Sequence, residues 1–135
     1  DDAAIEALHT ALVEAGATVK LVAPRVGGAK LRDGSTFAAD GQLAGTPSVM
    51  FDAVAIVLSS SGAVELSADA AAIDFVRDAF GHLKALMLDD GGRTLLKAAG
   101  VVADAGVFDV DDLAGFIAAA GTRQWAREKT VRMLA

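Results

Sequence analysis

The amino-acid sequence predicts an α/β domain built on a parallel sheet. Two uninterrupted apolar runs, at 52–58 and 84–88, have the composition of strands that are covered on both faces. Segments with helical apolar spacing alternate with them, which favours βαβ units with parallel strands and right-handed crossovers. The 135 residues, 53% of them hydrophobic, suffice for a buried core, so we expect residues 1–135 to form a single domain.

The first third of the chain predicts a helix, a strand and a hairpin. Apolar residues recur at helical spacing over 3–15, and a strand is predicted at 18–24. Asp33 and Gly34 lie between short alternating runs, which is a hairpin signal within 29–40. Doubly wound domains commonly begin with a strand rather than a helix. We therefore expect a first strand to precede Asp1 and the chain to be a piece of a longer polypeptide.

The rest of the chain continues the alternation up to its last residues. The pattern predicts a serine-rich loop at 58–67, a helix from its cap Ser67 to Gly81, a short helix at 93–99, a strand at 105–108, a helix at 113–120 and a final helix over the last fourteen residues.

Composition excludes several functions. A formal charge of −6 disfavours non-specific nucleic-acid binding, which needs a basic surface. The absence of Cys removes disulfides, thiolate zinc sites and a Cys nucleophile. No uncharged apolar run reaches the length of a membrane span, and a cytoplasmic protein is expected. The one basic concentration, in "TRQWAREKTVRMLA", predicts a solvated face or a docking surface; its cations are Arg123, Arg127, Lys129 and Arg132.

The stretch "LMLDDGGRTLLKAAG" (86–100) has the form of a strand, a Gly-lined turn and a helix, the geometry that displays a nucleophile in elbow enzymes. A carboxylate there could act as a nucleophile or bind Mg²⁺, but Asp90 just before a helix is favoured as a cap. Similarly, the amides around the serines at 59–61 could hold an anion, although a turn role for these hydroxyls is favoured.

Other polar residues do not assemble a site in the sequence. His9 lies inside the first predicted helix, and His82 lies at the end of another. The acidic run 104–112 lacks the spacing and the closing Glu of a calcium loop, so a turn with a helix cap is expected. No catalytic, cofactor-binding or metal-binding residue is predicted.

The order "EAGATVKLVAP", hairpin, "FDAVAIV", "KALML", Gly-lined turn and "LLKAAGV" resembles the class I glutamine-amidotransferase-like superfamily, in its protease and deglycase branch. The resemblance implies a flavodoxin-like three-layer sandwich. The enzymes of that family use a Cys at the turn, a His after it and a Glu near the first strand. The positions that match this Cys, His and Glu are Asp90, Gly91 and Ala4. The resemblance therefore implies a degenerate, vestigial site in which all three catalytic residues have been replaced.

The segment 101–135 is similar to the end of the large-subunit haem catalases. The shared features are Gly106-Val107, an acidic turn, an amphipathic helix and a pattern with Trp125, Arg127 and Glu128. This resemblance implies a non-catalytic accessory domain that acts in stability and assembly. Its partner is the catalase core of the same polypeptide, which holds haem, decomposes hydrogen peroxide under oxidative stress and forms a homo-oligomer. No cofactor is implied for this segment, because it lacks the Tyr that ligates catalase haem.

Two other functions remain open from the sequence. One is a free-standing hydrolase of the same superfamily that uses Asp90 or a serine of 59–61. The other is a chaperone-like binding module.

Overall fold

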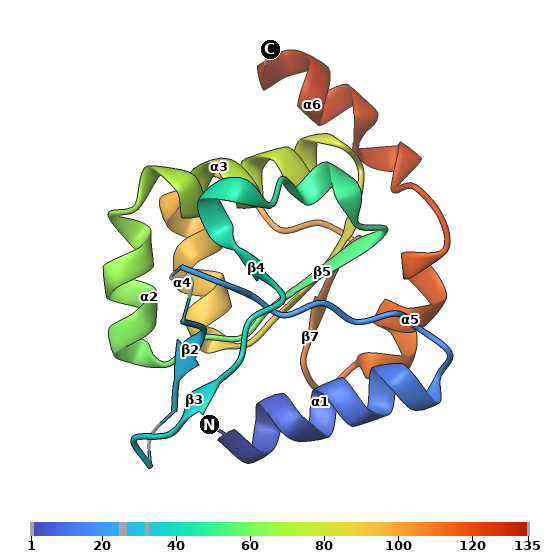
Figure 1. Ribbon diagram of the computed structural model, residues 1–135. Helices are drawn as coiled ribbons and strands as arrows, with labels where there is room; N and C mark the ends of the chain where they lie inside the picture. The colour runs from blue at the N-terminus through green and yellow to red at the C-terminus, as the bar shows by residue number, and fades with distance from the viewer. Residues whose placement is uncertain (1, 25–26, 32, 135) are drawn as a thin grey trace. The chain divides into compact units, whose positions relative to one another are not determined.

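The structure is a computed structural model that describes residues 2–24, 27–31 and 33–134 (Figure 1). The chain folds into two compact units, residues 1–47 and 48–135. Among the described residues, no helix is both long enough and apolar enough to cross a membrane.

The first unit begins with the predicted helix, α1 (Asp2–Glu14), which is confirmed. The strand predicted at 18–24 is much shorter: β1 (Val22–Ala23) pairs in parallel with β4 (Gly41–Gln42). Just before β1, the Leu21 N–H donates to the carboxylate of Asp40 at 2.7 Å, and the Leu21 carbonyl accepts from the N–H groups of Asp40 and Gly41 at 2.8 and 3.2 Å.

The hairpin predicted in the first unit is confirmed. β2 (Ala29–Lys30) and β3 (Thr36–Phe37) are antiparallel. Gly34 has a φ of +87°, which a residue with a side chain rarely adopts, and it lies in the turn as expected. A 3-10 helix, η1 (Leu43–Gly45), completes the described part of this unit.

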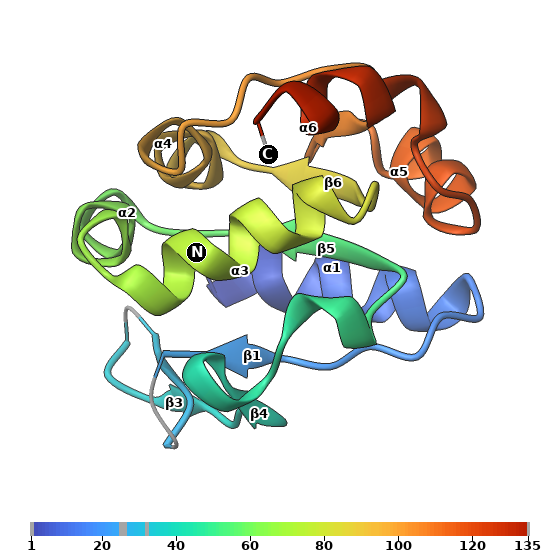
Figure 2. The same cartoon turned by 90° about the horizontal axis from the view of Figure 1, so that it is seen from above.

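The second unit contains the predicted parallel sheet, in the order β5 (Ala53–Ile56), β6 (Ala85–Leu88) and β7 (Val107–Asp109). All four residues of β6 are fully buried, as its continuous apolar run predicts for a central strand. Its helices are α2 (Ser60–Ser67), α3 (Ala70–Gly81), α4 (Asp90–Ala98) and α5 (Leu113–Ala120). In Figures 1 and 2, α2, α3 and α4 lie on one side of this sheet and α5 on the other. The fold class is therefore α/β with parallel strands, consistent with a flavodoxin-like domain.

The serine-rich loop predicted at 58–67 is wrong, because residues 60–67 form the helix α2. Ser59 caps α2 by accepting a hydrogen bond from the Gly62 N–H at 3.1 Å. Ser67 is the last residue of α2 and donates to the Ala63 carbonyl at 2.6 Å, so its predicted role as a cap is also wrong. Asp69 takes that role for α3, accepting from the Ala71 N–H at 2.8 Å.

The predicted end of α3 at Gly81 is confirmed, although Gly81 is not the left-handed residue that terminates the helix. Gly81 is its last helical residue, and the left-handed residue that ends the helix is Leu83, with a φ of 62°. The N–H of Lys84 donates to the Ala79 carbonyl, and that of Leu83 to the Phe80 carbonyl, at 3.1 and 3.0 Å. These two bonds form a Schellman motif, with a leucine where glycine is usual.

The last predicted helix is divided into a 3-10 turn, η3 (Trp125–Arg127), and a helix, α6 (Glu128–Leu134). One further 3-10 turn, η2 (Ser48–Met50), packs against α3. The helix predicted at 113–120 is confirmed as α5, which begins after its cap Asp112.

Candidate functional site

The turn between β6 and α4 is held by the carboxylate of Asp89. Its Oδ1 accepts a hydrogen bond from the Gly92 N–H at 2.7 Å and thereby caps α4. The Leu58 N–H, just beyond β5, donates to the same carboxylate at 3.0 Å from Oδ2 and 3.2 Å from Oδ1. Asp89 therefore ties the ends of two neighbouring strands together, and its oxygens are engaged by backbone donors.

Asp90 is the first residue of α4 and is exposed. The cap predicted for Asp90 is wrong by one residue, since Asp89 fills that position. Among the described residues other than glycine, Leu83 alone has a positive φ, so Asp90 lacks the strained backbone of a nucleophile elbow. Asp90 lies in the first turn of α4, where its negative charge interacts favourably with the positive end of the helix dipole.

Gly91 and Gly92 are buried against the chain that leaves β5. A Cβ at Gly91 would lie 2.2 Å from the Leu58 carbonyl oxygen, and one at Gly92 would lie 2.5 Å from that of Ile56. Both obstacles are backbone atoms, which cannot turn aside as a flexible side chain could. The position that matches the family's His therefore has no room for any side chain.

The remaining predicted residues do not complete a catalytic group. Ser59 and Ser61 lie at the start of α2, with their hydroxyl oxygens 3.2 Å apart. His9 lies in α1, and His82 is the exposed C-cap of α3. Ala4 belongs to α1, but its side chain lies outside the described residues. Within the described ranges, no three His, Cys, Asp or Glu side chains are grouped so that they could hold a metal ion.

Replacing Asp89 tests whether this turn is structural. Asp89→Ala removes the cap of α4 and the acceptor of the Leu58 N–H, so we expect the free energy of unfolding to fall by about 2 kcal/mol. Asp90→Ala is the matched control, and it should cost less than about 1 kcal/mol because it loses only an exposed dipole interaction. Urea unfolding followed by circular dichroism measures both. Equal losses for the two variants would contradict the assignment of Asp89 as the cap.

Three carboxylates of the acidic run 104–112 have structural roles. Asp112 caps α5 by accepting from the Gly115 N–H at 3.0 Å, which confirms the predicted turn and cap. Asp109 pairs with Arg93 of α4 at 2.9 Å, with both side chains partly exposed. Asp104 binds a buried arginine of the C-terminal segment.

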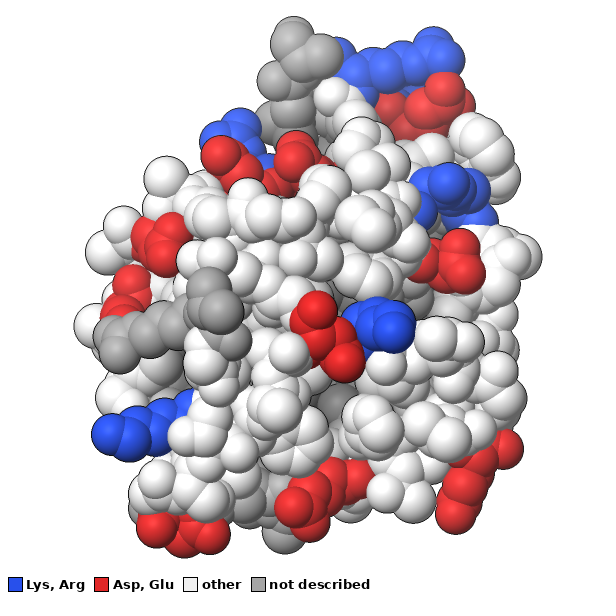
Figure 3. Space-filling model, in the orientation of Figure 1, with Lys and Arg blue, Asp and Glu red and all other residues white. Residues whose placement is uncertain are grey.

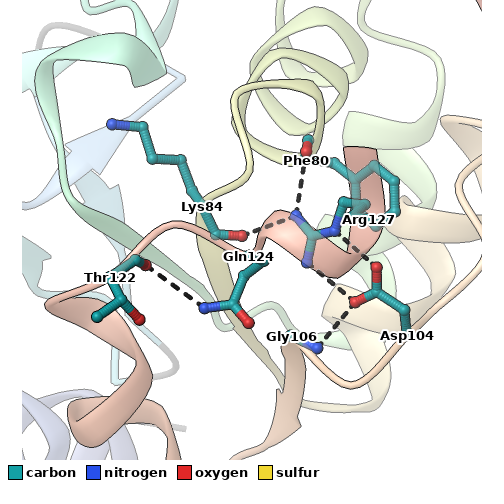
Figure 4. Close-up of polar contacts among 7 residues, drawn as sticks. All are labelled: Phe80, Lys84, Asp104, Gly106, Thr122, Gln124 and Arg127. Carbon is teal, nitrogen blue, oxygen red and sulfur yellow. Dashed lines mark hydrogen bonds and ion pairs between the residues drawn. The ribbon is translucent and has the colours of Figure 1, made fainter. Parts of the chain in front are cut away.

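That arginine is Arg127, only 3% exposed, and Figure 4 shows its contacts. Its guanidinium donates to both carboxylate oxygens of Asp104, at 2.6 Å from Nε and 3.0 Å from Nη2. Nη1 donates to the carbonyls of Phe80 and Lys84, at 3.0 and 2.8 Å. The guanidinium carbon also lies 3.9 Å from the centroid of the Phe80 ring. The prediction of a solvated or docking face is therefore wrong for Arg127, because its charge is buried and paired.

Backbone contacts extend this attachment along the C-terminal segment. The Gln124 N–H donates to the Leu83 carbonyl at 2.7 Å, and Nη1 of Arg123 donates to the His82 carbonyl at 2.9 Å. Residues 123–127 are therefore fastened to the turn between α3 and β6. Sequence reasoning missed this attachment, because the acceptors are backbone carbonyls more than forty residues away; the pattern around Trp125 was the only signal that singled out Arg127.

The ion pair predicts an acid-dependent loss of stability. Burial raises the pKa of Asp104, but the hydrogen bonds from Arg127 and Gly106 and the charge of Arg127 outweigh burial and lower it below the ordinary value. Because the pKa of Asp104 is lower in the folded state than in the unfolded state, its ionised carboxylate stabilises the fold. This contribution is fully present above the unfolded-state pKa of about 4 and is lost as the pH falls through the folded-state pKa.

We therefore expect the stability difference between the wild type and Asp104→Asn to be constant above about pH 5 and to shrink toward pH 3. Urea unfolding at a series of pH values measures it. A difference that stays constant down to pH 3 would show that Asp104 does not stabilise the fold through its charge.

Comparison with known proteins identifies the family of the chain. The family model for the C-terminal domain found in long catalases matches residues 1–123. Catalase C of Rhizobium meliloti (strain 1021) is 37% identical over 139 residues, covering 98% of this chain and 20% of that protein. Catalase HPII of Pseudomonas putida is 30% identical over 132 residues, covering 95% of this chain and 18% of that protein.

The two comparisons differ in how far they extend. The family match ends before the segment that carries Trp125 and Arg127, whereas the alignment with Catalase C covers 98% of the chain and so includes that segment. The chain spans a fifth or less of the length of these relatives. On the family match and the two alignments, the chain belongs to the family of C-terminal domains found in long catalases.

Proposed function

We propose that residues 1–135 are a single non-catalytic accessory domain of a long catalase and that they act in the stability and assembly of its catalase core. One observation carries this proposal. Gly91 lies where the resembling enzymes hold a His, and the Leu58 carbonyl would be 2.2 Å from any Cβ there. A catalytic His at this turn would require the backbone after β5 to move.

The engagement of Asp89 supports the same role. Its carboxylate accepts hydrogen bonds from two backbone N–H groups, which suits a structural cap better than a nucleophile. Asp90 is exposed at the start of α4 and has no strained backbone. The turn thus serves to join β5, β6 and α4.

The chain does not suit a haem site. A catalase haem takes a Tyr as its axial ligand, and the sequence contains neither Tyr nor Cys. We assign haem binding and peroxide decomposition to the catalase core of the same polypeptide, which is the partner of this domain. We expect the whole protein to be a homo-oligomer and cytoplasmic, the latter in keeping with a chain without Cys.

The absence of catalysis is tested with the purified chain. We expect no hydrolysis of ester, amide or glycated substrates above the background rate, identical results for Asp90→Ala, and no change in the haem absorption spectrum when haem is titrated. Turnover that Asp90→Ala or Ser59→Ala abolishes would overturn the proposal and favour a superfamily hydrolase.

A further inference from the structure

The C-terminal segment exposes the single tryptophan of the chain. Trp125 is 67% exposed at the start of η3, although an indole is among the largest apolar groups a protein can bury. Valines are also exposed on this domain, but scattered small apolar residues are normal on protein surfaces. Exposed tryptophans are different, because Trp is enriched among the residues that dominate the energy of protein interfaces.

The backbone that carries Trp125 is fixed on both sides. On one side the Gln124 N–H binds the Leu83 carbonyl, and on the other Arg127 is buried in four hydrogen bonds. A side chain presented by an ordered backbone loses less conformational entropy when it binds than one on a loose tail. The buried arginine therefore does more than attach the segment: it holds the indole outward in one place.

Exposed cations flank the indole. Arg123 and Lys129 are exposed, and the Arg132 side chain is exposed while paired with Glu128 at 2.6 Å. Of the four basic residues in 123–132, Arg127 is buried and paired with Asp104, so Arg123 and Lys129 are the cations next to the indole in the sequence that contribute exposed positive charge without an ion pair in the described structure. Figure 3 shows basic and acidic side chains side by side where α6 lies in Figure 1. We call Trp125, Arg123 and Lys129 the tail surface; its chemistry suits an apolar pocket with an acidic rim.

We infer that the tail surface docks onto the catalase core of the same polypeptide, with Trp125 as the anchor in a pocket of that core. The inference rests on the proposed function. Four fifths of the length of Catalase C lies outside its match to this chain, so the family supplies a large covalently linked partner. Covalent linkage raises the effective concentration of the two surfaces, so that one aromatic anchor with flanking charges can suffice for docking.

The test uses the full-length catalase, with hydroxyl-radical labelling of Trp125 measured by mass spectrometry before and after unfolding in urea. Docking predicts that Trp125 is strongly protected in the native protein. Labelling close to that of the unfolded protein would overturn the inference. Protection that disappears on dilution, together with dissociation of the oligomer, would also overturn it, by assigning the surface to a second copy.

A variant pair gives the second readout. Trp125→Ala in the full-length protein should increase the rate at which a protease releases the domain by about tenfold or more, as for the loss of an interface anchor. Val64→Ala is the matched control, because Val64 is 71% exposed in α2 and its loss should change the rate little. Equal rates for the two variants would overturn the inference.

Deletion of the whole domain separates this inference from the proposed function. If deletion destabilises the core while Trp125→Ala has no effect on domain release, the accessory role stands and the assignment of the tail surface fails. If deletion leaves stability and assembly unchanged, the accessory role itself fails.

Discussion

Arg127→Ala is expected to lower the free energy of unfolding by about 3–5 kcal/mol, the largest effect of any single substitution considered. The substitution removes a guanidinium that is 3% exposed, together with its four hydrogen bonds. The acceptors of these bonds are the Asp104 carboxylate and the carbonyls of Phe80 and Lys84. Asp104 keeps the Gly106 N–H and Phe80 keeps the Leu83 N–H, but the partly buried carboxylate loses the positive charge that pairs with it. Breaking one side of a buried ion pair costs more than the net value of the hydrogen bonds themselves.

Urea unfolding of the purified chain measures this loss, and Arg132→Ala is the matched control. Arg132 forms an exposed pair with Glu128 one helical turn away, so its replacement should cost less than about 0.5 kcal/mol. Arg127→Lys should keep the charge but lose the forked bonds to Asp104, and we expect an intermediate result. A loss below about 1 kcal/mol for Arg127→Ala would contradict the anchoring role.

Gly91→Ala is expected to be the second most damaging substitution, with a loss of about 3 kcal/mol from overpacking against backbone. The added Cβ would lie 2.2 Å from the Leu58 carbonyl oxygen and 2.9 Å from its carbon, so α4 or the segment after β5 must shift. Asp90→Cys with Gly91→His, which would restore the residue types of the enzymes, should therefore unfold the domain rather than activate it.

The matched control for Gly91→Ala is Gly81→Ala, in the last turn of α3. A Cβ at Gly81 would meet nothing within 4 Å, and the backbone is helical there. This substitution should stabilise the domain by about 0.5–1 kcal/mol, because alanine loses less conformational entropy in a helix than glycine. Circular dichroism in urea compares the two. A neutral Gly91→Ala would mean that the turn has room for a side chain and would remove the main support for a closed site.

The predictions from sequence succeed where a pattern acts locally. The apolar segment at 84–88 predicted the central strand, observed at 85–88, and the spacing in 113–120 predicted α5. The serine-rich segment misled, because serine favours both turns and helix caps, and Ser59 uses its hydroxyl as a cap. The sequence pattern could not distinguish Asp89 from Asp90 as the cap, since either residue precedes an equally good helix.

The two features that matter most for function depend on long-range packing. Gly91 signals a turn in the sequence, but the lack of room at Gly91 comes from the Leu58 carbonyl, in the segment that follows β5. Arg127 is one of four basic residues in its segment, and only the fold brings it to Phe80, Lys84 and Asp104. Neither contact has a signature in local periodicity or composition. The resemblance to known families singled out both positions without explaining either.

Deletion of this domain from the full-length catalase tests the central claim most directly. The measurement is hydrogen peroxide turnover per bound haem, together with the thermal inactivation midpoint and the oligomeric state. An accessory role predicts that turnover per haem is unchanged in the protein that still folds, while the inactivation midpoint falls or assembly is impaired. Loss of turnover in a protein that remains folded, assembled and fully loaded with haem would contradict it.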